Sequence, residues 1–118
     1  MDKRNLRIGD YVKDPNNFGY TIKVGLDELR YSELFNPAPL YEEFFTKNGF
    51  EVQELGGETN YFLSKGPVSI RANRVDEILW SVSVRNLRDK RKFEGEIRAI
   101  HELQHATSDC LVNIPFLS

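Results

Sequence analysis

Apolar and polar residues alternate along several short segments of this chain, and a period of two predicts β-strands. The pattern is clearest over residues 20–24 and 79–84, where every second side chain is apolar. Weaker versions lie at residues 6–12, 50–52, 61–63 and 68–72, and Leu29 and Tyr31 could begin one further strand. Turn signals such as Asp14-Pro15-Asn16-Asn17 and Gly56-Gly57 separate these segments, as in hairpins.

Two other segments repeat apolar residues every three or four positions, which predicts helices at about 40–48 and 93–111. The first follows Pro37-Ala38-Pro39, turns Phe44 and Phe45 toward the core, and ends near Gly49. The predicted fold class is therefore α+β, with a small antiparallel sheet of about six strands and both helices packed on it. At 118 residues the chain is expected to form a single domain, 1–118.

Composition adds few constraints to this picture. Hydrophobic residues make up 40% of the chain and charged residues 29%, which is typical of a globular protein. Cys110 is the only cysteine, so an intrachain disulfide is excluded, and no apolar run is long enough to span a bilayer. These features predict a soluble cytoplasmic protein with no membrane partner. The charge is uneven, because residues 27–58 carry a net −6 and residues 65–92 a net +5.

The pentapeptide His101-Glu102-Leu103-Gln104-His105 has the spacing of zinc peptidases and contains both histidines of the chain. On a helix, residues four apart lie on one face, so His101 and His105 could bind one Zn²⁺. Glu102 would then be the general base that activates a metal-bound water. This arrangement defines one hypothesis, a minimal zinc-dependent hydrolase with zinc as its cofactor.

Several features argue against that hypothesis. A catalytic zinc needs a third protein ligand, and the usual downstream glycine and histidine positions hold Ser108 and Leu111. Arg98 is expected to share the side of His101 and to pair with Glu94 on the helix surface. Helical geometry places His101 at the boundary of the core and His105 in solvent. The favoured interpretation is that the histidines have a structural or surface role, with no cofactor bound.

The densest basic run suggests a second kind of site. It consists of Arg85, Arg88, Lys90, Arg91 and Lys92, interrupted by Asp89. Such a run can contact phosphates, so it could bind nucleic acid or an acidic partner, although a solvated connection is the simpler interpretation. No aromatic residue lies between these bases in the sequence.

Several short motifs together resemble a known family. They are Leu6-Arg7-Ile8-Gly9, Pro37-Ala38-Pro39-Leu40-Tyr41-Glu42-Glu43-Phe44, Asn48-Gly49-Phe50-Glu51, Tyr61-Phe62-Leu63 and Ile100-His101-Glu102-Leu103-Gln104. In this order they resemble a family of small uncharacterised proteins from Bacteroides-type bacteria and their phages and prophages. The resemblance implies no established activity. It also implies an asparagine where this chain has His105, so that relatives would lack the second zinc ligand.

Three hypotheses about function follow. The favoured one is a non-enzymatic binding or interaction protein of phage or mobile-element origin, whose acidic or basic face engages another protein. The first alternative is the zinc hydrolase that uses His101, Glu102 and His105. The second is nucleic-acid binding through residues 85–92.

Overall fold

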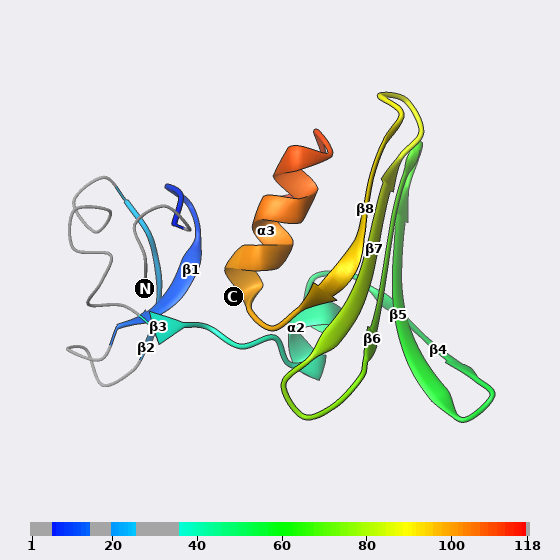
Figure 1. Ribbon diagram of the computed structural model, residues 1–118, viewed down its shortest axis with the longest axis horizontal. Helices are drawn as coiled ribbons and strands as arrows, with labels where there is room; N and C mark the ends of the chain where they lie inside the picture. The colour runs from blue at the N-terminus through cyan, green and yellow to red at the C-terminus, as the bar shows by residue number, and fades with distance from the viewer. Residues whose placement is uncertain (1–5, 15–19, 26–35, 118) are drawn as a thin grey trace.

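The computed structural model of the chain describes residues 6–14, 20–25 and 36–117. These residues form an α+β fold with two antiparallel sheets (Figure 1). The small sheet has the strand order β2-β1-β3, with β1 at Tyr11–Asp14, β2 at Tyr20–Lys23 and β3 at Asn36–Pro37. The large sheet keeps the order of the chain, with β4 at Glu51–Leu55, β5 at Glu58–Lys65, β6 at Val68–Arg74, β7 at Trp80–Asn86 and β8 at Arg91–Ile97.

The α+β class is confirmed, but the single sheet of about six strands is wrong. The described strands before residue 40 pair only with one another, and they enclose a small core of Leu6, Val12 and Val24. This separate core explains the division, because each sheet buries its own apolar face. The strand suggested at Leu29 and Tyr31 lies outside the described residues.

The first predicted helix is present as α2 (Glu42–Lys47), slightly shorter than expected. Phe44 and Phe45 are fully buried, and the Phe45 ring lies 4.8 Å from that of Trp80, centroid to centroid. The chain leaves the helix through Gly49, whose φ of 86° is a conformation that glycine adopts without strain. The helix therefore anchors the aromatic centre of the core, as the sequence indicated.

The second predicted helix begins later than expected. Residues 91–97 form strand β8, and the helix, α3, spans Ile100–Asp109. Phe93 and Ile97 face the core in register with Val84 and Trp80 of β7. Residues four apart share a face in a strand as well as in a helix, so these two side chains fitted both patterns.

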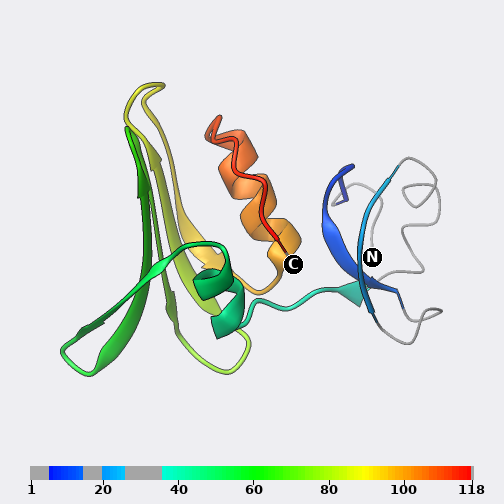
Figure 2. The same ribbon diagram turned by 180° about the vertical axis from the view of Figure 1, so that it is seen from behind.

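Three layers make up the fold. In both views α3 lies between the small sheet and the large sheet, and α2 lies on the same side of the large sheet as α3 (Figures 1 and 2). The main core fills the space between the helices and the large sheet. The opposite face of the large sheet is not covered by any described element. No described helix is long and apolar enough to cross a membrane.

Candidate functional site

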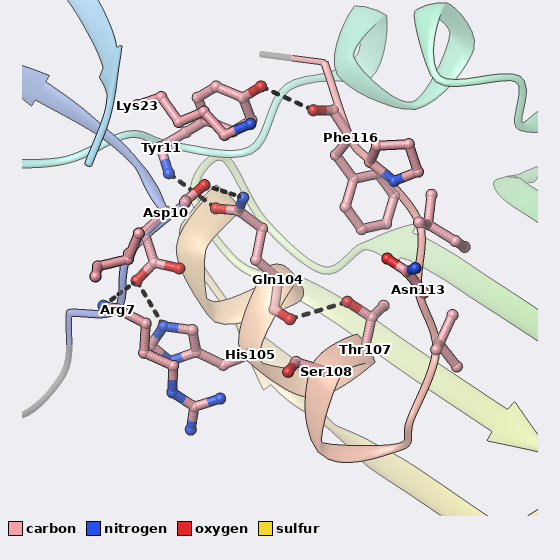
Figure 3. Close-up of a pocket in the computed structure, with 15 residues that line it drawn as sticks. Arg7, Asp10, Tyr11, Lys23, Gln104, His105, Thr107, Ser108, Asn113 and Phe116 are labelled. Carbon is pink, nitrogen blue, oxygen red and sulfur yellow. Dashed lines mark hydrogen bonds and ion pairs between the residues drawn. The ribbon is translucent and has the colours of Figure 1, made fainter. Parts of the chain in front are cut away.

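The His101–His105 motif occupies the first half of α3, as predicted, and its polar side chains contact the segment that precedes β1. His105 contacts Asp10 most directly: its Nε2 lies 2.6 Å from the Asp10 Oδ2 (Figure 3). The Arg7 backbone N–H donates to the same carboxylate oxygen at 2.7 Å. The side chains of His105 and Asp10 are only 18% and 4% exposed. The prediction that His105 is solvated is therefore wrong.

Gln104 holds the backbone on either side of Asp10. Its Oε1 accepts a hydrogen bond from the Tyr11 N–H, and its Nε2 donates to the Gly9 carbonyl, each at 2.8 Å (Figure 3). One side-chain amide thus satisfies a donor and an acceptor that would otherwise be partly buried without partners. We call Gln104, His105, Gly9, Asp10 and Tyr11 the α3 clamp.

Glu102 is held at the start of the helix. Its Oε1 accepts hydrogen bonds from the backbone N–H groups of Arg98 and Ala99, each at 3.2 Å. These donors lie at the N-terminus of α3, where the helix dipole also favours a negative charge. The carboxylate that would act as general base in a zinc peptidase therefore caps its own helix.

His101 has a different environment from His105. It is only 7% exposed, and its Nδ1 has no hydrogen-bond partner among the described residues. Burial lowers the pKa of His101 below its ordinary value, an effect that the nearby Asp10 charge partly opposes. The two imidazole centroids are 5.4 Å apart. His101 is therefore a buried, neutral ring beside the clamp.

A third ligand for zinc is missing from the described part of the chain. These residues contain no group of three or more histidine, cysteine, aspartate or glutamate side chains that could hold a metal. Asp10 is an acid near His105, but it contacts the Nε2 that a metal would need. Arg98 and Glu94 do not form the predicted helical pair, because Glu94 lies on β8, where it contacts Arg85 at 3.5 Å.

The clamp lies between two surface hollows. One, of about 360 Å³, is bounded by residues 7–11, α3 and residues 112–116, and Arg7, Lys23 and His105 line it (Figure 3). The other, of about 490 Å³, is lined by His101, Glu102, His105 and apolar residues that include Phe93. Asp109 also lines this second hollow, but among the described residues the carboxylate that contacts His105 is that of Asp10.

The basic run does not form one surface. Arg85 and Lys92 are directly paired across β7 and β8, on the uncovered face of the large sheet. Arg91 points to the other side, where its Nη1 donates to the Asp109 carbonyl at 3.3 Å. Arg88 and Lys90 lie in the turn between these strands. The bases are adjacent in the sequence, but the fold divides them among the uncovered face, the opposite side of the sheet and the turn.

Sequence reasoning missed Asp10 as the partner of His105, and Gly9 and Tyr11 as the partners of Gln104. Arg7 also forms an exposed ion pair with Asp109 at 3.0 Å. These contacts join residues more than 90 positions apart, which no local pattern reveals. One signal was available: the first and last motifs of the family resemblance, at residues 6–9 and 100–104, contain Gly9 and Gln104.

Cys110 does not add a nucleophile to the site. The thiol is buried, and burial raises its pKa, an effect to which the Asp109 charge adds.

Comparisons of the chain with protein-family models, curated proteins and solved structures give no significant match.

Proposed function

We propose that this chain is a non-enzymatic binding protein that engages another protein. Three of the four polar residues of its enzyme-like motif are already used internally, because His105 and Gln104 hold the segment before β1 and Glu102 caps α3. A partner would then have to bind elsewhere on the surface, and the edge strand β4 is the best candidate. The proposal rests on the exposed edge of this strand.

β4 has a paired neighbour on one side only among the described strands. It contains neither lysine nor proline, which commonly protect sheet edges, and it exposes Val52 by 50% and Leu55 by 65%. The opposite edge, β8, carries Arg91 and Lys92. An extended segment of a partner could therefore add to the sheet beside β4 by main-chain hydrogen bonding.

The charge of this edge indicates which partner it would accept. Glu51, Glu54 and Glu58 are all exposed on or beside β4. Pairing β4 with β4 of a second copy would bring these acids together, which is unfavourable. A partner segment with lysine or arginine among apolar residues would complement the edge in both charge and hydrophobicity.

A mobile-element origin is part of the same proposal and is supported by the family resemblance. The two segments that carry much of that resemblance, residues 6–9 and 100–104, meet where Gln104 contacts Gly9. This contact helps to hold the fold together, which is a structural reason for the two motifs to occur in the same chain. The resemblance thus concerns how the chain folds, and the partner is a separate question.

Affinity capture with variant pairs tests the proposed function. The wild-type chain should retain a partner that a Val52→Lys/Leu55→Lys variant loses. A Leu87→Lys variant should retain it, because Leu87 is 74% exposed on the distant β7–β8 turn. Titration of the isotope-labelled chain with the identified partner segment should then shift the β4 amide signals. Charge reversal at Glu51 and Glu54 should weaken binding, and reversal of the partner's bases should restore it.

The zinc-hydrolase alternative has one observation in its favour. The rings of His101 and His105 lie 5.4 Å apart, and the His101 Nδ1 has no partner among the described residues. Elemental analysis of protein purified without an affinity tag decides the matter. We expect less than about 0.1 zinc per chain, unchanged in His105→Asn, since a genuine site should be nearly full. Stoichiometric zinc that disappears in His105→Asn would overturn the non-enzymatic proposal.

A further inference from the structure

The uncovered face of the large sheet carries an alternating arrangement of arginine and serine. Arg71 on β6 is directly opposite Ser83 on β7, and Ser69 is directly opposite Arg85. Within each strand the two residues are two positions apart, so all four side chains share one face. The arginines thus stand at two diagonal corners of a square and the serines at the other two.

This square forms a hollow. It has a volume of about 150 Å³ and is lined by Phe62, Ser69, Arg71, Ser83 and Arg85. The serine side chains are short and half-buried, whereas both arginines are exposed. The hollow therefore offers hydroxyl groups near its floor and guanidinium groups at its rim, which is a suitable donor set for a phosphate.

The lining of the hollow contains two arginines and no acid. Lys92 is directly opposite Arg85, and like charges in that position are unfavourable without an anion between them. Arg71 makes no carboxylate contact among the described residues, and its guanidinium carbon lies 5.8 Å from the Phe62 ring centroid. Arg85 has only the 3.5 Å contact with Glu94, in which both side chains are more than half exposed.

We propose that this hollow is a phosphate-binding subsite for single-stranded nucleic acid. The square would hold one backbone phosphate, and a neighbouring base would stack on Phe62, where Arg71 already lies beside the ring. Glu94 and Glu96 on β8 and Glu51 beside Phe62 confine the positive region to the middle of the sheet. A narrow cationic strip suits one strand better than a duplex.

This inference is independent of the proposed function, because it uses the face of the sheet and not the β4 edge. It also differs from binding through the basic run of the sequence. Of that run, only Arg85 lines the hollow and Lys92 is its neighbour on β8, whereas Arg71 and Phe62 come from other strands. The two ideas therefore predict different effects for Arg85 and Arg88.

Fluorescence anisotropy with labelled oligonucleotides of about ten residues, U-rich RNA and T-rich DNA, tests the subsite at low salt. Arg71→Gln and Arg85→Gln should each weaken binding about fivefold or more and reduce the salt slope by about 1. Phe62→Leu should weaken binding about fivefold or more with an unchanged salt slope, because it removes stacking and no charge. Glu94→Gln should strengthen binding, since it removes a competing carboxylate.

Arg88→Gln is the matched control, because it removes the same charge from the β7–β8 turn and should change affinity less than about twofold. Thermal unfolding of each variant confirms that these surface substitutions leave the fold intact. Three results would overturn the inference: no oligonucleotide binding at low salt, equal losses for Arg88→Gln and Arg85→Gln, or tighter binding of a phosphoserine peptide than of either oligonucleotide.

Discussion

At the scale of single residues, the two histidines of the motif show how position decides the surroundings of a side chain. His105 has a carboxylate within hydrogen-bonding distance, whereas the Nδ1 of His101 is buried with no partner among the described residues. They are one helical turn apart, and His101 is the more deeply buried of the two. The spacing was visible in the sequence, but this difference was not, because it arises from Asp10 in a distant segment.

The lowered pKa of His101 predicts that acid destabilises the fold. The unfolded chain protonates this histidine near its ordinary value of 6.5, whereas the folded chain does so only at lower pH. Since the unfolded state then binds more protons, stability is complete above about pH 6.5 and falls as the pH drops toward the lowered folded value. Urea unfolding at several pH values should show a smaller acid-induced loss for His101→Phe than for the wild type. An equal loss in both proteins would mean that other groups cause it.

At the scale of elements, α3 contacts both the large sheet and the segment before β1. Ile100 and Leu103 bury its apolar side against the large sheet, and Gln104 and His105 hold the segment before β1. From the sequence, this second side was expected to face solvent. Its polar residues resemble those of an exposed helix face, and only the three-dimensional fold brings Gly9 and Asp10 to them.

Replacing Gln104 with alanine should lower the free energy of unfolding by about 1–3 kcal/mol, because it leaves a backbone donor and acceptor without partners. Urea denaturation followed by circular dichroism measures this change. Ser108→Ala is the matched control on the same helix, because Ser108 is exposed, and it should change stability by less than about 0.5 kcal/mol. Similar values for the two variants would show that the Gln104 contacts do not stabilise the fold.

Asp10 and His105 should be energetically coupled. In a double-mutant cycle with Asp10→Asn and His105→Asn, we expect an interaction energy of about 0.5–3 kcal/mol near neutral pH. The reason is their 2.6 Å contact in a site where both side chains are largely shielded from water. Repeating the cycle with Asp109 in place of Asp10 provides the control. Additive effects of Asp10→Asn and His105→Asn would contradict the clamp.

Local patterns predicted some elements better than others. Strand β7 and helix α2 were recognised because their periods of two and of three to four are unambiguous over their lengths. β8 was assigned to a helix, since Phe93 and Ile97 have a spacing that both structures allow. The division into two sheets was not predicted, because alternation identifies a strand but not its partner.

At the scale of the whole molecule, two cores of unequal size are joined through α3. The small core contains Leu6, Val12 and Val24, whereas the main core extends over α2, α3 and the large sheet. The clamp and the Tyr11 hydroxyl, which donates to the Phe116 carbonyl at 2.8 Å, connect them. Because the small core buries less apolar area, the small sheet should open without unfolding the rest.

Native-state hydrogen exchange tests this partial opening. The amides of Gly9 and Val24, which bond to Val24 and Asp10 carbonyls, should exchange at a lower opening free energy than those at the centre of β7. Val84→Ala, at a fully buried position of the main core, should lower the opening free energy of the β7 amides by about 2 kcal/mol. It should leave the Gly9 and Val24 amides unchanged, since Val84 stays packed when only the small sheet opens. Gln104→Ala should lower both sets equally, because every opening breaks the clamp. An equal effect of Val84→Ala on both sets would instead show that the described residues unfold as one unit.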